Sequence, residues 1–382
     1  MSKFISAERQ VPLVGITLGT RPGIIMLAPV IHELRRRQCP HFVIHTGQHY
    51  SPNMDLQMFE DLDLPAPEYR LQGVAERKSH GAQTAAMLEG IEAVLLERRP
   101  CLFLVGGDAN TNLSGALAAR KLRIAVGHIE AGERSFDWQM PEEHNRVMID
   151  HVSDHLFVTG KGGVENLRRE SVRGQIHVVG NPIVDASINH FTLARRKSSA
   201  LDRFGLTAKH YAIVTMHREE NVDVPERLKG ALQGVSQAAQ SSGLPALMLA
   251  HPRTLVRLKE FGLEAWLRQL PGLRVEPAVG YLDFLNLLAN ARMVFTDSGG
   301  VQQEACIHQV PCVTLRDNTE WTETLEIGAN RLAGCNPEVI RVAAAAALET
   351  APAWANPFGD GTTARQIADV VVRELDRFRS AA

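Results

Sequence analysis

Residues 11–19, VPLVGITLG, form a continuous apolar run that leads into an amphipathic stretch at 23–38. The run has the length of a strand that is buried on both faces, and the stretch after it has helical spacing. The same alternation continues through the first half of the chain, with strands expected at 41–47, 101–108, 123–132, 155–160 and 175–180 and helices at 81–98, 111–121, 142–152 and 162–170. Such alternation predicts a parallel sheet covered by helices on both faces.

The pattern restarts in the second half of the chain. A helix is expected at 184–197, and we interpret the polar stretch 195–202 as a linker. Strands follow at 211–217, 246–251, 273–277, 293–297 and 311–315, with helices at 225–241, 254–262, 281–290, 301–308 and 336–349. The sequence therefore predicts an α/β protein with two Rossmann-like, doubly wound domains that face a cleft. A last amphipathic helix near 361–380 fits either half.

Composition excludes several classes of protein. The 382 residues include 41 Lys and Arg against 43 Asp and Glu, a net charge of −2, so we expect no nucleic-acid partner and no membrane partner. No apolar stretch reaches the roughly 18 residues that a membrane-spanning helix needs, and the N-terminus does not resemble a signal peptide. The five cysteines form no CxxC pair, which favours reduced thiols in a cytoplasmic protein.

Two predicted strand ends have features of a phosphate-binding loop. The first strand ends in GTRPG, where helix-start amides and the guanidinium of Arg21 suit a phosphate. The strand at 293–297 ends in Ser298-Gly299-Gly300, whose amides open the next helix, and Glu304 one turn later can accept hydrogen bonds from ribose hydroxyls. The alternative for each is an ordinary strand-to-helix turn, with a solvated arginine in the first case and a plain N-cap in the second.

Acidic and imidazole side chains also follow predicted strands. Asp108 ends one strand, and His128 and Glu130 lie two positions apart in the next, so on a regular strand they share a face. Glu142 starts a predicted helix, and His217 ends a strand of the second half. Each alone is more simply a surface or ion-paired residue, but several together at strand ends indicate chemistry. The motifs HExxH, Walker A and EF-hand do not occur, and we expect no metal.

Nine segments between about residues 14 and 375 carry a family pattern: GTRPGIIMLAPVI, HTGQHYSPNM, GGDANTNLSGALAARKL, VGHIEAGERSFDWQMPEEHNRVMIDHVSD, VGNPIVDA, TMHREENVD, AHPRT, FTDSGGVQQEA and NPFGDG. In this order they resemble the non-hydrolysing UDP-N-acetylglucosamine 2-epimerases. The resemblance implies the glycosyltransferase-B (GT-B) fold and a homodimer. It implies one domain at 1–185 plus 364–382, with a returning C-terminal helix, and a UDP-binding domain at 186–363.

The resemblance also implies a reaction, the interconversion of UDP-GlcNAc and UDP-ManNAc without NAD or another cofactor. UDP is eliminated anti across C1–C2 to leave 2-acetamidoglucal, and it adds back with C2 protonated on the other face. The matched positions are Arg21, Ser298, Gly299 and Gly300 for phosphate, Glu304 for ribose, Phe284 beside uridine, Asp108, Glu130 and Glu142 as acid/base candidates, His217 for departure of UDP, and Gln48 and His49 for a second, activating UDP-GlcNAc.

Three positions depart from the family pattern. Family members usually carry Glu and Lys where this chain has Gly23 and Met26, so a cation is absent from the expected nucleotide-sugar site. Trp321 stands where an Arg is common.

Three functions remain open from the sequence. The first is a UDP-GlcNAc 2-epimerase that supplies ManNAc for a surface polysaccharide. The second is an epimerase of another UDP-HexNAc derivative, such as UDP-2,3-diacetamido-glucuronate, and the third is a GT-B transferase or nucleotide-sugar-binding protein. The carboxylates at 108, 130 and 142 favour chemistry at the sugar ring over simple transfer.

Overall fold

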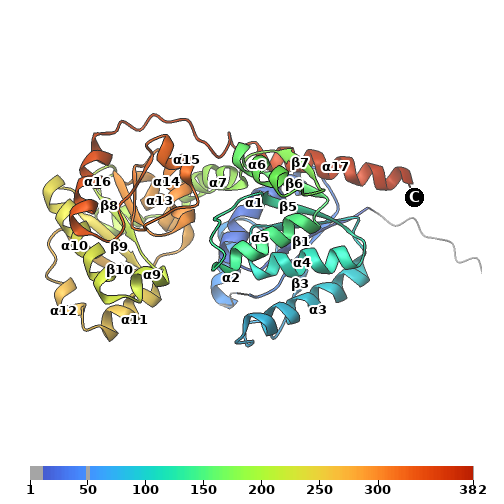
Figure 1. Ribbon diagram of the computed structural model, residues 1–382, viewed down its shortest axis with the longest axis horizontal. Helices are drawn as coiled ribbons and strands as arrows, with labels where there is room; N and C mark the ends of the chain where they lie inside the picture. Colours follow the sequence, from blue (N-terminus) through green and yellow to red (C-terminus); the bar gives the residue numbers. More distant parts are fainter. Residues whose placement is uncertain (1–11, 49–51, 382) are drawn as a thin grey trace, which may run out of the picture. The chain divides into compact units, whose positions relative to one another are not determined.

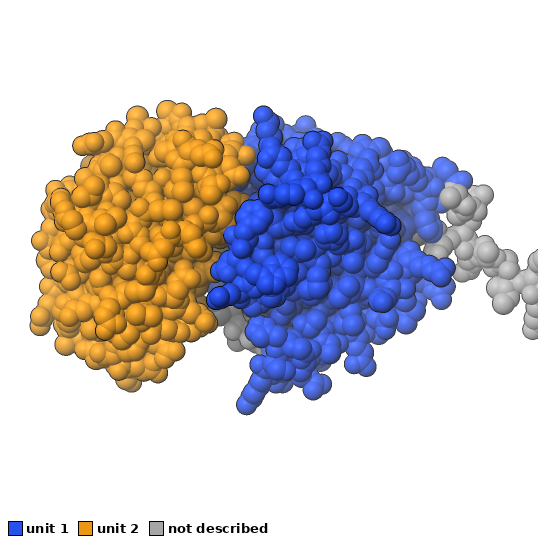
Figure 2. Space-filling view, in the orientation of Figure 1, with its two compact units in different colours: residues 1–186, 358–382 blue, residues 187–357 orange. Residues whose placement is uncertain are grey.

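The computed structural model describes residues 12–48 and 52–381 and divides into two compact units (Figure 1). Unit 1 comprises Met1–Ala186 and Phe358–Ala382, and unit 2 comprises Ser187–Pro357 (Figure 2). Each unit has its own parallel sheet and its own hydrophobic core. The prediction of two Rossmann-like α/β domains is therefore confirmed.

The described part of unit 1 contains a sheet of seven parallel strands in the order β3-β2-β1-β4-β5-β6-β7. These strands are β1 (Val14–Leu18), β2 (His41–His45), β3 (Tyr69–Arg70), β4 (Leu102–Gly106), β5 (Ala125–Ala131), β6 (His155–Val158) and β7 (Gln175–Val178). The helices are α1 (Arg21–Arg36), α2 (Pro52–Asp61), α3 (His80–Arg98), α4 (Asn110–Lys121), α5 (Pro141–Val152), α6 (Lys161–Arg169) and α17 (Thr363–Ala381). Helix α7 (Pro182–Lys197) contains the boundary between the units.

Unit 2 contains six parallel strands among its residues, in the order β10-β9-β8-β11-β12-β13. They are β8 (Ala212–Thr215), β9 (Ala246–Ala250), β10 (Leu273–Pro277), β11 (Met293–Thr296), β12 (Cys312–Thr314) and β13 (Asn330–Leu332). The helices are α8 (Ala200–Phe204), α9 (Glu219–Val222), α10 (Pro225–Ser242), α11 (Pro252–Glu260), α12 (Glu264–Leu267), α13 (Tyr281–Asn290), α14 (Gly299–Ile307), α15 (Thr322–Glu326) and α16 (Pro337–Glu349).

The interpretation of residues 195–202 as a linker is wrong. Helix α7 continues to Lys197, and α8 begins at Ala200. The side chain of Ala200 is buried in a core cluster of unit 2, and the Ser198 hydroxyl donates to Oδ1 of Asp283 at 2.5 Å. Polar composition suggested a loop here, but packing against α13 orders the segment.

The central strands are mainly apolar because helices cover both faces of each sheet. Every residue of β1, β4 and β9 is buried. Within the described ranges, no helix combines the length and the hydrophobicity that crossing a membrane requires.

Both sheets are doubly wound about their first strand. β1 lies between β2 and β4, and β8 lies between β9 and β11. In such sheets the chain reverses its winding direction at this point, and ligands bind outside the carboxyl ends of the strands there. We therefore expect ligand-binding residues in the loops after β1 and β4 and in those after β8 and β11.

Gly19, directly after β1, is required by the close approach of two hydroxyl groups. Its φ is not in the left-handed region. A Cβ atom at Gly19 would lie 2.0 Å from Oγ1 of Thr111 and 2.2 Å from Oγ1 of Thr46. These two hydroxyls hydrogen-bond to each other at 2.7 Å. Glycine thus lets the ends of β1 and β2 meet the start of α4.

Helix α17 returns the chain to unit 1. The amides of Thr363 and Ala364 donate to the carboxylate of Asp185 at 3.2 and 3.0 Å, which satisfies two of the amides that a helix start leaves without partners. Nη1 of Arg37 on α1 donates to Oδ1 of Asp369 at 2.6 Å. These contacts fix the start of the returning helix and the side of it that packs against α1.

Candidate active site

Asp108 follows β4 and is held by two consecutive residues of α5. Nη2 of Arg146 donates to Oδ2 of Asp108, and Nδ2 of Asn145 donates to the backbone oxygen of Asp108 at 2.8 Å. Nη1 of Arg146 also lies 3.3 Å from Oε2 of Glu143. The Asp108 side chain is 37% exposed, so this fixed carboxylate remains accessible to a ligand.

Glu130 in β5 has a strained backbone and a perturbed carboxyl group. Its φ is +71°, in the left-handed region that side chains other than glycine rarely adopt, and the pairing of β5 with β6 shifts register there. Nδ2 of Asn181 donates to Oε1 of Glu130 at 2.8 Å. Burial, and then the nearby Asp108 carboxylate, raise the pKa of Glu130 to about 7. Close to neutral pH, this residue can therefore donate or accept a proton.

The irregularity at Glu130 breaks the simple alternation on which we predicted that His128 and Glu130 share a face. His128 is fully buried, with Nδ1 at 2.6 Å from Oδ1 of Asp150 and Nε2 at 3.2 Å from the carbonyl oxygen of Gly107. His128 thus connects α5 to the residue before Asp108, which makes it part of the support of the site.

A pocket of about 470 Å³ opens in unit 1 beside Asp108. Its lining includes the predicted residues Gln48, Asp108 and Glu142 together with the basic residues Arg77 and Lys78. Such a mixture of carboxylates and cations suits a polar, anionic ligand.

The two acidic residues of the PEEHNR segment have different environments. Glu142 is exposed at the start of α5, on the wall of the pocket. Glu143 is buried, and its carboxylate accepts the amides of Ser135 and Phe136 at 2.9 and 3.1 Å. Glu143 therefore stabilises the loop before α5, whereas Glu142 faces the pocket.

Gln48 is positioned by α4. Its Oε1 accepts hydrogen bonds from the backbone N–H and the hydroxyl of Thr111 at 2.9 and 2.8 Å. The other residue predicted for this place, His49, lies outside the described residues.

Arg21 is the first residue of α1, where Oγ1 of Thr20 accepts the amide of Gly23 at 3.3 Å. Among the described residues, Arg21 has no ion-pair partner, and a guanidinium at a helix start suits an anion.

Met26 is buried next to Gly107. A Cβ atom placed on Gly107 would lie 3.5 Å from Cε of Met26 and 3.5 Å from Oε2 of Glu130. The Met26 methyl group and the Glu130 carboxylate therefore border the same glycine.

In unit 2, the loop after β11 leads into α14 at Gly299. A Cβ atom on Gly299 would lie 2.3 Å from Oε1 of Glu320, whereas one on Gly300 would have no atom within 4 Å. Gly299 is thus required by the close approach of Glu320, whereas the space beside Gly300 is open. Ser298 caps this helix start by position, with its own amide donating to Oγ1 of Thr296 at 3.0 Å. Unpaired amides at a helix start form an anion site.

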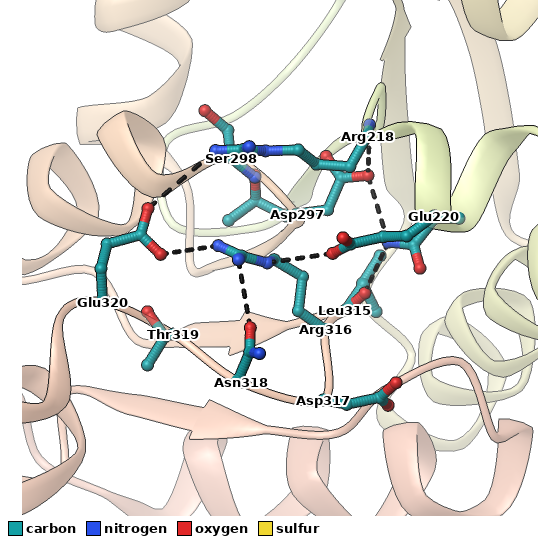
Figure 3. A network of polar contacts seen from close by, with 12 residues as sticks. Arg218, Glu220, Asp297, Ser298, Leu315, Arg316, Asp317, Asn318, Thr319 and Glu320 are labelled. Carbon is teal, nitrogen blue, oxygen red and sulfur yellow. Dashed lines mark hydrogen bonds and ion pairs between the residues drawn. The ribbon is translucent and has the colours of Figure 1, made fainter. Parts of the chain in front are cut away.

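Asp297, at the end of β11, organises the loop after β8 (Figure 3). Its carboxylate accepts the backbone amides of His217 and Arg218 at 3.0 Å each, and Oδ1 lies 3.2 Å from Nδ1 of His217. Burial alone would raise the pKa of Asp297, but the contacts with His217 and the backbone amides lower it. A buried carboxylate therefore orients the His217 ring, which is 38% exposed.

Arg316 anchors Glu320 against the start of α14 (Figure 3). Its guanidinium contacts Glu220 at 3.2 Å, Asn318 at 3.1 Å and Glu320 at 2.8 Å. Because Arg316 is buried, three acceptors compensate for its loss of hydration.

Glu304 lies further along α14 and is 6% exposed. Its Oε1 accepts a hydrogen bond from the Tyr281 hydroxyl at 3.0 Å. Burial raises the pKa of Glu304 to about 7, and the hydrogen bond from Tyr281 partly opposes this shift. Phe284, on the same helix as Tyr281, is partly buried against the core cluster that contains Leu287. No group of three or more His, Cys, Asp or Glu residues in the described part of the chain could hold a metal ion.

Comparison with known proteins identifies the family. Residues 32–372 match the family described as UDP-N-acetylglucosamine 2-epimerase. The chain belongs to this epimerase family. The UDP-N-acetylglucosamine 2-epimerase of Methanocaldococcus jannaschii is 46% identical over 359 residues, which are 93% of this chain and 98% of that protein.

This family member also resembles solved structures and a relative that is named for a different UDP-sugar. A crystal structure of M. jannaschii UDP-GlcNAc 2-epimerase in complex with UDP-GlcNAc and UDP matches with a TM-score of 0.86 and 45% identity, over 94% of this chain and 99% of that one. A UDP-2,3-diacetamido-2,3-dideoxy-D-glucuronate 2-epimerase of Pseudomonas aeruginosa is 36% identical, over 93% of this chain and 98% of that protein.

In unit 1 of this epimerase-family chain, the predicted residues Gln48, Asp108 and Glu142 line one pocket, and Asp108 is near enough to Glu130 to raise its pKa. In unit 2, His217 lies beside Asp297, which precedes Ser298. Four residues of the site were not predicted from the sequence, namely Arg146, Asn181, Tyr281 and Asp297. Two signals were available, because Arg146 lies one turn after Glu142 and Asp297 directly precedes Ser298. Asn181 and Tyr281 reach their partners only through the tertiary fold.

Proposed function

We propose that this protein interconverts UDP-GlcNAc and UDP-ManNAc by inversion at C2 of the sugar. The observation that carries the proposal is the pair of carboxyl groups at the ends of β4 and β5. Asp108 is ion-paired with Arg146, whereas burial and Asp108 raise the pKa of Glu130 to about 7. Two carboxyl groups in different environments can act as a base and an acid at the same pH.

The proposed reaction has two stages. A carboxylate removes the C2 proton while the C1–O bond breaks, so UDP departs with the bonding electrons and 2-acetamidoglucal remains. UDP then attacks C1, and a proton reaches C2 on the opposite face. Asp108 and Glu130 are the acid/base pair in this proposal, and Glu142 on the pocket wall is the third candidate. Neither stage needs a redox cofactor, because the loss of H⁺ and UDP is reversed by their addition.

The proposal assigns the departing UDP to groups at two strand–helix junctions. Arg21 at the start of α1 and Ser298, Gly299 and Gly300 at the start of α14 are assigned to the pyrophosphate. Glu304 is assigned to the ribose and Phe284 to the uracil ring. His217, oriented by Asp297, is assigned to the charge that develops on the leaving phosphate.

A second UDP-GlcNAc is proposed to activate the enzyme from the part of the pocket that Gln48 lines, next to the catalytic candidates Asp108 and Glu142. The cations Arg77 and Lys78 in the pocket lining support an anionic ligand. His49 belongs to the same proposal by sequence position. We also propose that the protein acts as a homodimer in the cytoplasm, where it supplies ManNAc for a surface polysaccharide.

A comparison of substrates tests the proposed function. The protein is incubated separately with UDP-GlcNAc and with UDP-2,3-diacetamido-glucuronate, and the products are separated by chromatography and identified by NMR. We expect conversion of UDP-GlcNAc to UDP-ManNAc in preference to the diacetamido substrate. Preference for the diacetamido substrate would make it the physiological class, and release of UDP without an epimer would indicate transfer or hydrolysis.

A further inference from the structure

Tyr281 and Glu304 form an isolated polar pair inside unit 2. Tyr281 is the first residue of α13 and Glu304 lies on α14, and each is 6% exposed. The phenol donates to Oε1 of Glu304 at 3.0 Å. Among the described residues, the Glu304 carboxylate has no second hydrogen-bond or ion-pair partner. Burying a carboxyl group with a single donor costs free energy of folding, so packing alone does not explain why the pair is present.

The position of Glu304 on α14 suits contact with the ribose of a bound nucleotide. Glu304 lies five residues after Gly299, which corresponds to about 7.5 Å along the helix axis from the start of α14. A nucleoside diphosphate whose pyrophosphate binds at that start carries its ribose hydroxyls at a comparable distance. One carboxylate oxygen is held by Tyr281, so the other oxygen is the one left for a ligand.

The Tyr281 ring is itself held in place. His190 of α7 packs edge-on against it, with ring centroids 5.7 Å apart and an interplanar angle of 87°. The phenol therefore has little freedom to turn away from Glu304.

We infer that Tyr281 is a positioning residue for ribose recognition. By holding Oε1 of Glu304, it fixes the rotamer in which Oε2 accepts a hydrogen bond from a ribose hydroxyl. The inference rests on the proposed function, in which Glu304 binds the ribose. It predicts that the contribution of Tyr281 appears only with ligands that carry those hydroxyls.

The test compares how Tyr281→Phe changes the affinity for two ligands, one with and one without the ribose hydroxyls. Binding of UDP and of 2′,3′-dideoxy-UDP is measured by calorimetry for the unaltered protein and for Tyr281→Phe. The hydrogen bond contributes about 0.5–1.5 kcal/mol, so we expect the Kd of UDP to rise roughly three- to tenfold in Tyr281→Phe. The Kd of dideoxy-UDP should remain within about twofold of its original value. In a Glu304→Gln background, Tyr281→Phe should cause less than about half of this effect on UDP binding.

Tyr211→Phe is the matched control. The Tyr211 hydroxyl is also buried in unit 2, but it donates to the carbonyl oxygen of Leu287 at 2.5 Å. Tyr211→Phe should leave the ratio of the two affinities unchanged. Equal weakening of both ligands by Tyr281→Phe, or unchanged UDP binding, would overturn the inference. Failure of the unaltered protein to bind UDP would instead contradict the proposed function.

Discussion

The carboxylate of Asp297 lies 3.2 Å from Nδ1 of His217 and also accepts the backbone amide of the same residue. One buried anion thus fixes both the ring and the main chain of His217. The carboxylate accepts the proton of Nδ1 and so orients the ring, and a proton on Nε2 can then be donated to a phosphate ligand. In the proposed reaction, this relationship prepares His217 for the departing phosphate.

Replacing Asp297 should therefore affect catalysis through His217. We expect Asp297→Asn to lower kcat about 10- to 100-fold, because the amide can hydrogen-bond to Nδ1 without favouring one tautomer. Steady-state kinetics together with thermal unfolding check this. Asp223→Asn is the control, because Asp223 pairs with Arg253 and Arg257 and not with His217. A kcat near that of the unaltered protein would remove Asp297 from this role.

Glu130 predicts a specific pH dependence. Its pKa is raised from 4.5 to about 7, so the folded protein favours the protonated form. The associated stabilisation is fully present below about pH 4.5 and is lost as the pH rises through about 7. If protonated Glu130 is the acid, kcat should also fall above about pH 7.

Glu130→Gln should remove this pH limb. Glu130→Gln and Asp108→Asn, each made singly, should lower turnover by about 10²–10⁴-fold, and both variants should fold normally. Measurement of kcat from about pH 5 to 9 gives the profile. Glu165→Gln on the exposed face of α6 should retain both the limb and the rate. Near-normal turnover in Glu130→Gln and Asp108→Asn would show that these carboxyl groups are structural.

Arg21 should contribute to phosphate affinity. We expect Arg21→Ala to raise the Kd of UDP about tenfold or more, since a charge-assisted hydrogen bond contributes about 1.5–3 kcal/mol. Calorimetry measures the change. Arg35→Ala, on the exposed face of the same helix, should leave the Kd of UDP unaltered. Equal affinities for all three proteins would exclude Arg21 from the site.

Met26 allows the environment of Glu130 to be changed directly. A lysine at this position would bring an ammonium group close to the carboxylate, because the methyl group and Oε2 of Glu130 both border Gly107. We expect Met26→Lys to move the pH limb of kcat down by roughly one unit and to tighten binding of UDP-sugar. Met26→Leu should keep the limb in place. A fall in melting temperature with no change in limb or affinity would show that Met26 serves packing only.

The elements that carry the site could be predicted because their sequence patterns are local. The apolar run at 11–19 contains β1, and the helical spacing that follows it contains most of α1. Short elements such as β3 and β13 were not predicted, because two or three residues have no periodicity to detect. The stretch 195–202 was misinterpreted because burial of Ala200 outweighs its polar neighbours.

The site itself was only partly predictable for a related reason. Residue type and position at strand ends pointed to Asp108, Glu130 and His217. The left-handed backbone of Glu130, its contact with Asn181 and the pairing of Tyr281 with Glu304 arise from contacts between segments far apart in the chain. The perturbed pKa of Glu130 depends on burial and on Asp108, so no local pattern contains it.

Proton NMR of UDP-GlcNAc incubated with the protein in D₂O tests the proposed elimination and re-addition of UDP most directly. Elimination and re-addition require that the C2 proton is exchanged with solvent while the epimer forms. For this mechanism, we expect UDP-ManNAc to appear with deuterium at C2 and Glu130→Gln and Asp108→Asn to slow its appearance. Formation of UDP-ManNAc that retains the original C2 proton, or release of UDP without any epimer, would contradict it.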